Sequence, residues 1–247
     1  MKVCAVIPVY NHALAVGRTL AEVRAHGLPV VLVNDGSDAH CTEVLRTLAA
    51  GPGVALVELS ENLGKGGAVK AGLMHALTLG YSHALQVDAD GQHNLSDVQR
   101  FLDAATENPQ ALICGVPEYD SSIPKARLYG RYLTHVWVWI NTLSGALKDS
   151  MCGFRVYPLA AVCQLLEQEY TGNRMDFDPE VLVRWFWRGG DVKQLSTRVH
   201  YPEDGVSHFL PGMDNWLISC MHARLFFGML WRWPLWLLGL QKRGRAL

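Results

Sequence analysis

The amino-acid sequence has almost no net charge and no closely spaced pair of cysteines. Its 247 residues include 22 Lys and Arg against 23 Asp and Glu, so no overall basic field favours a nucleic-acid partner. The six cysteines contain no CxxC pair, which argues against a disulfide scaffold or a zinc site and favours buried thiols in a reducing compartment. With 49% hydrophobic and 18% charged residues, disorder is excluded, and one large α/β domain or two small ones are expected.

No hydrophobic run reaches the ~20 apolar residues that a membrane-spanning helix needs. Near the start, the apolar run 3–7 stops at Pro8, too early for a signal-peptide core, so we expect the protein to stay in the cytoplasm. Near the end, residues 225–240 are apolar except for Arg232, and Pro234 follows two residues later. That segment either lies on a membrane surface or forms a helix that packs on the core or on a partner chain.

The last part of the chain is also basic. From Asn215 onward the sequence has five Lys or Arg residues and no acidic residue. An anionic cytoplasmic leaflet attracts such a segment, so we expect peripheral association with the cytoplasmic face of a membrane. The five residues are Arg224, Arg232, Lys242, Arg243 and Arg245.

The first half of the sequence alternates short β-branched runs with helical periodicities. The run 3–9 predicts a buried strand, and the apolar spacing from Ala13 to Val23 predicts a helix that ends at Gly27. Ser37 or Asp38 is a suitable N-cap for the next helix. Further strands are predicted at 30–33, 54–59, 83–87 and 111–114, and further helices at 38–50, 65–79 and 96–107.

Strands that alternate with helices of this length pair in parallel through right-handed crossovers. The carboxyl ends of parallel strands lie along one edge of the sheet, and ligands bind at that edge. Asn11, Asp35 and Asp88 each follow a predicted strand closely. We therefore expect these three side chains to converge, although they are far apart in the sequence.

The second half differs in composition, because all eight tryptophans lie between Trp137 and Trp236. We expect aromatic-rich helices without strand alternation there. They would form an acceptor-binding or membrane-facing portion attached to the first half, whose alternating strands and helices are typical of nucleotide-binding sheets. Core packing is the preferred interpretation for four of them, Trp137, Trp139, Trp185 and Trp187. The expected organisation is a domain over 1–210, with a nucleotide-binding half at 1–115 and an acceptor-side half at 116–210. A helical segment at 211–247 follows.

Two carboxylates stand directly after the predicted strand 83–87. Asp88 and Asp90, in the sequence Asp-Ala-Asp-Gly, place hard oxygen ligands near one point, as Mg²⁺ or Mn²⁺ on a diphosphate requires. Such a metal ion helps a diphosphate to leave, so the pair indicates transfer chemistry at a phosphate-activated substrate. The alternative is a solvated turn formed with Gly91.

Four segments follow one another in the order and spacing typical of glycosyltransferase family 2. They are Ile-Pro-Val-Tyr-Asn at 7–11, Val-Asn-Asp-Gly-Ser at 33–37, Asn-Leu-Gly-Lys-Gly-Gly-Ala at 62–68 and Asp-Ala-Asp-Gly-Gln-His at 88–93. A later segment, Asp149 with Cys-Gly-Phe-Arg at 152–155, resembles the dolichyl-phosphate and polyprenyl-phosphate sugar transferase branch. The resemblance covers roughly residues 1–200 and implies the GT-A fold, an α/β fold with a mostly parallel sheet flanked by helices.

The resemblance implies a nucleotide pocket formed by the first two segments and the strand before Asp88. Pro8, Tyr10 and Asn11 are expected to line the nucleoside, and Asp35 to bond the base or the ribose. Ala89 is expected beside the nucleotide as well. The alternatives are a core position for Tyr10 and a turn before a helix for Asp35.

The resemblance also implies a phosphate and metal site. Glycines around Lys65 allow close approach of the backbone, and Lys65 with the helix start favours an anion. Asp88 is expected near both nucleotide and metal, and Asp90 is expected to bind Mg²⁺ or Mn²⁺ directly, with Gln92 as a further ligand. Arg127 and Arg131 either reach phosphates or are surface cations of a helix.

Transfer to a hydroxyl acceptor requires a base on the face of the sugar opposite the nucleotide. Asp149 is the first candidate, because the resemblance puts its segment beside the donor sugar, and Glu180 is the second. The alternative for Asp149 is a cap or a partner of Arg155. A phosphate acceptor needs no strong base. The resemblance further implies inversion at the anomeric carbon.

The acceptor stays open, because this chain lacks the terminal pair of membrane-spanning helices of the polyprenyl-phosphate enzymes. A lipid phosphate and a lipid-linked hydroxyl are both tenable, and His208 is either an acceptor contact or a plain loop residue. We expect a metal-dependent transferase that moves a sugar, with UDP as the expected nucleotide, to a lipid-linked or membrane-surface acceptor. The rivals are a sugar-phosphate nucleotidyltransferase and a non-catalytic nucleotide-sugar-binding subunit.

Overall fold

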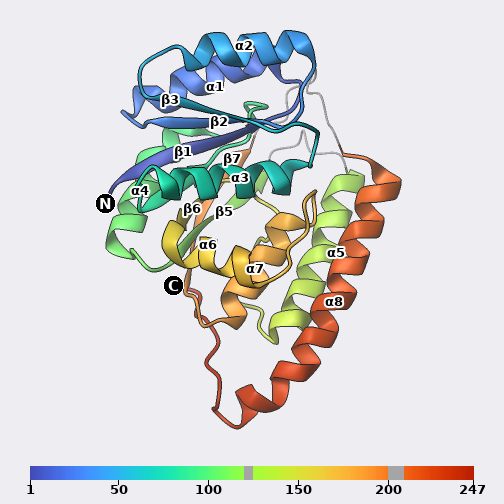
Figure 1. The fold of residues 1–247 in the computed structure, drawn as a ribbon. Coiled ribbons are helices and arrows are strands. Elements are labelled where there is room, and N and C mark those ends of the chain that lie inside the picture. Colours follow the sequence, from blue (N-terminus) through green and yellow to red (C-terminus); the bar gives the residue numbers. More distant parts are fainter. Residues whose placement is uncertain (120–124, 200–208) are drawn as a thin grey trace.

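A seven-stranded sheet lies between helices in the fold (Figure 1). The computed structural model describes residues 1–119, 125–199 and 209–247, with the side chains of 119 and 125–127 left aside. The strand order is β3-β2-β1-β4-β6-β5-β7. β1 pairs in parallel with β2 and β4, and β2 pairs in parallel with β3. The carboxyl ends of these four strands therefore share one edge of the sheet.

The predicted elements of the first half are confirmed, with ends that shift by a few residues. Asp38 caps α2, because its Oδ1 accepts a hydrogen bond from Cys41 N at 2.8 Å. A single 3₁₀ turn, η1 (Leu95–Asp97), precedes α4. The other elements are β1 (Val3–Val9), α1 (Ala13–Ala25), β2 (Val30–Asn34), α2 (Ala39–Ala49), β3 (Val54–Glu58), α3 (Lys65–Thr78), β4 (His83–Gln86), α4 (Val98–Glu107) and β5 (Leu112–Tyr119).

The expectation that the second half lacks strands is wrong. β6 (Arg155–Pro158) inserts between β4 and β5 and runs antiparallel to both, and β7 (Val192–Val199) pairs in parallel with β5 at the sheet edge. β6 is buried at all four positions, and its neighbours on both sides decide its conformation. The helices of this half are α5 (Lys125–Thr142), α6 (Leu159–Gln168), α7 (Phe177–Trp187) and α8 (Pro211–Leu237).

Alternating side chains of the strands build two cores, one on each face of the sheet. On β1, Cys4 and Val6 point to the core shared with α3, α6, α7 and part of α8, whereas Ala5, Ile7 and Val9 point to the core shared with α1, α2 and α4. The result is three layers, helix on sheet on helix. This arrangement and the four parallel strands confirm the predicted α/β fold.

The expectation of core positions for four tryptophans is right for two of them. Trp185 and Trp187 on α7 are 6% and 2% exposed, whereas Trp137 and Trp139 on α5 are 36% and 38% exposed. α5 has only a narrow buried stripe, and Tyr129, Tyr132 and Leu133 on its outer face are exposed to solvent. A tryptophan-rich helix is therefore not by itself a core helix in this chain.

α8 packs beside α5 along the side of the molecule (Figure 1). Met221, Leu225 and Met229 enter the core, and Asn141 on α5 contacts the His222 ring at 3.3 Å. Within the described residues, no helix is long and apolar enough to cross a bilayer. The division at residue 210 stays a prediction.

Candidate active site

The edge of the sheet predicted to bind ligands gathers the polar residues that follow β1, β2 and β4. Asp35 N donates to Val9 O at 2.9 Å, and Asn11 N donates to Ser37 Oγ at 3.1 Å. Asn11 adopts a positive φ of 55°, which an asparagine tolerates, and its Oδ1 accepts from Asp38 N at 2.8 Å. The loops after β1 and β2 are thereby fixed to each other.

Asp35 organises the glycine-rich loop before α3. Its Oδ1 accepts from Leu63 N at 2.7 Å, and its Oδ2 accepts from Gly64 N at 3.0 Å and Asn62 Nδ2 at 3.1 Å. Burial raises the pKa of Asp35, and the two backbone donors oppose that rise. Gly64 has a φ of 89°, which favours glycine. In this structure the Asp35 carboxylate shapes the loop, and its predicted contact with a base or ribose stays a prediction.

Lys65 opens α3 and joins two acidic segments. Its Nζ lies 2.8 Å from Asp88 Oδ2 and 3.1 Å from Asp178 Oδ2. Burial alone lowers the pKa of Lys65, but Asp178 and Asp88 raise it well above its ordinary value, so the side chain carries a fixed positive charge. Asp178, at the start of α7, is a neighbour that the sequence analysis did not single out.

The segment 149–155 packs directly against this centre. A Cβ added to Gly153 would lie 2.7 Å from Lys65 Nζ and 2.9 Å from Asp88 Oδ2, so no other residue fits there without displacing one of them. Arg155 is fully buried and donates to the carbonyls of Ser150, Cys152 and Asp178. This arginine fixes the segment in place and also ties it to α7.

Asp88 and Asp90 are the residues that can hold a metal ion. Asp88 Oδ1 is buried and has no hydrogen-bond partner among the described residues, while Oδ2 faces Lys65 and His93. Asp90 Oδ1 accepts from Gln92 N at 3.0 Å, which leaves its other oxygen for a ligand. Mg²⁺ commonly takes one or two carboxylates plus substrate phosphates. The donor set fits such an ion, although no cluster of three acidic, His or Cys ligands exists in the described part of the chain.

Asp149 is buried among hydrogen-bond donors and the Arg131 cation. Its Oδ2 lies 2.7 Å from Arg131 Nη2 and 3.3 Å from His135 Nε2, and its Oδ1 accepts from Met151 N and Cys152 N. Burial raises the pKa of Asp149, but Arg131 and His135 more than offset this and hold it well below its usual range. Arg131 is therefore a partner of Asp149 and not a surface cation. Arg155 does not pair with Asp149.

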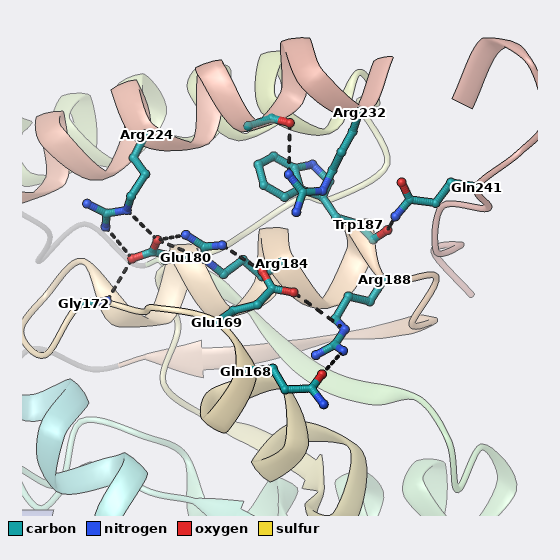
Figure 2. A network of polar contacts seen from close by, with 11 residues as sticks. Gln168, Glu169, Gly172, Glu180, Arg184, Trp187, Arg188, Arg224, Arg232 and Gln241 are labelled. Atoms are coloured by element: carbon teal, nitrogen blue, oxygen red, sulfur yellow. Dashed lines mark hydrogen bonds and ion pairs between the residues drawn. The ribbon is translucent and has the colours of Figure 1, made fainter. Parts of the chain in front are cut away.

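Glu180 is enclosed by arginines and is fully buried. Oε1 accepts from Arg184 and Arg224, and Oε2 accepts from Arg224 and from Gly172 N (Figure 2). Both oxygens are thus engaged by donors, as those of Asp149 are. The two differ in position, because the segment 149–155 packs against Lys65, so Asp149 stays the first candidate for the base.

The comparisons with known proteins agree with this geometry. A model of the family described as glycosyl transferase family 2 matches residues 4–171. The chain belongs to glycosyl transferase family 2. It is therefore a glycosyltransferase that uses a nucleotide sugar, and the predicted enzyme class is confirmed.

Several curated relatives of this family 2 glycosyltransferase belong to the branch that its sequence resembles. Dolichyl-phosphate beta-glucosyltransferase ALG5C of Trichomonas vaginalis is 27% identical over 243 residues, which cover 90% of this chain and 70% of the relative. ALG5D of the same organism is 29% identical over 208 residues, which cover 80% of this chain and 62% of the relative. The resemblance to this branch is confirmed, and the chain spans about two thirds of these relatives' length.

Solved structures with the same fold include glucosyl-3-phosphoglycerate synthase of Mycobacterium tuberculosis in complex with Mn²⁺ and uridine-diphosphate-glucose. That structure has a TM-score of 0.68 and 12% identity, and the match covers 92% of this chain and 78% of the other. A second structure of the same enzyme, with UDP, has a TM-score of 0.67 and 13% identity and covers 92% and 79%. The predicted GT-A fold is confirmed.

The remaining predicted residues of this family 2 glycosyltransferase are placed as follows. Pro8 and Tyr10 are half-buried at the end of β1, Ala89 is 3% exposed, and Gln92 is half-buried. His208 and the Arg127 side chain lie outside the described residues. A cavity of about 450 Å³, lined by Asn108, Asp191 and Leu247 among others, lies at the opposite edge of the sheet, where β5 and β7 begin. It is not part of the predicted site.

Proposed function

We propose that this glycosyltransferase moves a sugar from a UDP-sugar, with a divalent metal ion, to a lipid-linked acceptor at a membrane surface. The observation that carries the metal and donor part is the buried Asp88 Oδ1, which has no partner among the described residues, on the carboxylate whose Oδ2 faces the Lys65 ammonium. A carboxylate oxygen of this kind is costly to bury without a ligand, and a metal ion supplies one. The relative structure with Mn²⁺ and uridine-diphosphate-glucose supports the choice of donor.

Asp88 and Asp90 are the proposed metal ligands, and Gln92 is a further one. The metal ion, when bound, neutralises the diphosphate that leaves the anomeric carbon. Lys65 contributes a positive charge that is fixed by Asp88 and Asp178 and lies at the helix start, where α3 also presents backbone N–H groups. Pro8, Tyr10, Asn11, Asp35 and Ala89 are the proposed nucleotide contacts.

Asp149 is the proposed base for a hydroxyl acceptor. Arg131 and His135 hold the pKa of Asp149 well below its ordinary value, so the carboxylate is ionised at neutral pH and can accept a proton. Its low pKa makes it a weak base, and an acceptor that is already a phosphate anion needs none. Arg131 is then a cation for that phosphate. The names of the curated relatives, dolichyl-phosphate glucosyltransferases, favour the phosphate acceptor.

The acceptor is proposed to be held at a membrane by α5 and α8. Both helices present apolar side chains outward at spacings of three and four residues, Tyr129, Tyr132, Leu133, Val136 and Ile140 on α5 and Phe227, Leu230, Trp231, Trp233 and Leu237 on α8. Tyr and Trp prefer the interface between lipid and water. Exposed Lys242 and Arg243 follow α8 and attract anionic lipid. The cytoplasmic face is the proposed location.

Nucleotide release from purified protein tests the donor. With Mn²⁺ present, UDP-glucose, GDP-mannose and dTDP-glucose are supplied with short-chain polyprenyl phosphate. The proposal predicts UDP release that requires the lipid phosphate. Pyrophosphate release from a sugar phosphate and UTP would instead identify a nucleotidyltransferase, and nucleotide binding without any turnover would identify a binding subunit.

A further inference from the structure

Residues 171–176, in the connection between α6 and α7, pack against the glycine-rich loop at 62–68. Gly67 N donates to Asn173 O at 2.8 Å. A Cβ added to Gly64 would lie 2.7 Å from Asn173 O and 2.8 Å from Arg174 Cγ. The loop and the 171–176 connection are therefore closely packed and share a backbone hydrogen bond, so we expect a shift of one to affect the other.

α8 holds the same connection from the other side. Arg174 Nε lies 3.1 Å from Asp214 Oδ1 on the first turn of α8, and Asp214 is fully buried, with Oδ2 accepting from Leu210 N. A second link runs from Arg224 on α8 to Glu180 and from Glu180 Oε2 to Gly172 N at 2.8 Å (Figure 2). The 171–176 connection therefore lies between α8 and the glycine-rich loop and contacts both.

Arg174 also acts on the opposite side of the loop. Burial is the main influence on the pKa of Asp35 and raises it, and the Arg174 charge is among the influences that lower it. Asp35 is the carboxylate that holds Leu63 N and Gly64 N. Arg174 thus pairs with a buried carboxylate of α8, and its charge also acts on the pKa of the residue that shapes the loop.

We propose that Arg174, anchored by Asp214, is a positioning residue that sets the glycine-rich loop for the donor diphosphate. Arg174 thereby links α8, the helix proposed to face the membrane, to the loop proposed to bind the donor. The inference rests on the proposed function for the identity of the donor, but the link between α8 and the loop is a property of the free protein.

Arg174→Gln tests the link, with Arg188→Gln as the matched control. Both arginines are partly buried, with side chains 25% and 35% exposed, but Arg188 binds Glu169 and Gln168 in the network around Glu180 and Arg184, whereas Arg174 binds Asp214 (Figure 2). Hydrogen exchange of the Gly67 amide in the free protein should be about ten-fold faster in Arg174→Gln and unchanged in Arg188→Gln. The Kd for UDP with Mn²⁺ should rise about ten-fold, with kcat changing less, and Arg174→Lys should restore part of the affinity.

Three outcomes decide the matter. Equal Gly67 exchange in Arg174→Gln, Arg188→Gln and the unmodified protein overturns the inference. Faster exchange with no nucleotide binding by the unmodified protein upholds the link and removes the proposed donor. If Arg174→Gln does not fold, Asp214→Asn and Arg224→Gln replace it, and unchanged Gly67 exchange in both overturns the inference.

Discussion

The ammonium of Lys65 lies 2.8 Å from the carboxylate of Asp88, so the residue predicted to bind phosphate neutralises the residue predicted to serve the metal ion. Asp178 lies 3.1 Å from the same ammonium. Lys65 thereby pairs with two poorly exposed carboxylates, and Arg155 Nη1 also lies 3.9 Å from Asp178 Oδ1. A divalent metal ion and a diphosphate bring charges of both signs, so donor binding can replace this pairing without leaving a charge unmatched.

Substitution of Lys65 should therefore reduce stability as well as donor binding. Lys65→Met leaves Asp88 without its lysine partner and Asp178 with Arg155 at 3.9 Å, and loss of one partner of a buried pair costs about 3 kcal/mol. Lys65→Arg should cost less, because it keeps the charge. Urea denaturation of the three proteins measures the free energy of unfolding. A loss below about 1 kcal/mol in Lys65→Met would show that the pair is not structural.

Asp149 should make the protein sensitive to acid. Its pKa in the folded state lies below the unfolded value of about 4, so its stabilising effect is complete above that pH and is lost as the pH falls. Asp149→Asn should lower the free energy of unfolding at pH 7 and flatten its decline below about pH 4. Parallel slopes for the variant and the unmodified protein would contradict the pairing with Arg131 and His135.

The same variant addresses catalysis. Transfer to a hydroxyl acceptor should fall by about 100-fold or more in Asp149→Asn, because general base catalysis typically contributes that much. With a phosphate acceptor, Asp149→Asn should change the rate only by changing the position of Arg131. A rate equal to that of the unmodified protein with a hydroxyl acceptor would exclude Asp149 as the base.

His222 should weaken the contact between α5 and α8 in mild acid. Burial lowers its pKa to about 4, and its ring stacks on Trp137 with centroids 6.0 Å apart. Between about pH 6.5 and 4 the unfolded chain binds more protons, so the free energy of unfolding should fall by up to roughly 3 kcal/mol as the pH decreases. His222→Leu should remove this decline. A decline of the same size in His222→Leu, measured by urea denaturation, would assign it to other groups.

The outer face of α8 should bind anionic vesicles. Phe227 and Trp231 are 69% and 80% exposed, so replacing both with Ser should leave the fold intact and abolish cosedimentation with phosphatidylserine vesicles. Leu14 on α1 is 97% exposed and lies outside α5 and α8, so Leu14→Ser is the matched control. Equal binding by the double variant and the control would remove the membrane surface from the proposal.

The sequence predicts the first half of the fold well, because β1, β2 and β4 are largely buried parallel strands, and β3 is a half-buried edge strand with an apolar run of its own. It does not predict β7, whose residues 193–195 are half-buried and mostly polar, because an edge strand is fixed by its partner β5. β5 itself continues beyond its pairing with β6 and includes Pro117. No hydrogen bond to β6 requires at that position the backbone N–H that proline lacks. Tertiary pairing decides these elements.

The site was predictable where a short segment carries several functional groups, and less so where the groups come from distant segments. Asp35, Lys65 and Asp88 lie at one sheet edge as the parallel strands require. Asp178 and His135 come from separate helices, and nothing in their local sequence indicates that they face Lys65 and Asp149. The only signal for Asp178 was its place in the Phe-Asp-Pro-Glu segment at 177–180.

Calorimetric titration of UDP into the protein, with and without Mn²⁺, tests the central claim most directly. Asp90→Ala should keep the fold, because Asp90 bonds only Gln92 N within its own turn among the described contacts. The unmodified protein should bind UDP tightly only with Mn²⁺, and Asp90→Ala should lose at least ten-fold in affinity with Mn²⁺ and nothing without it. Equal affinity of the two proteins for UDP in the presence of Mn²⁺ would contradict the account.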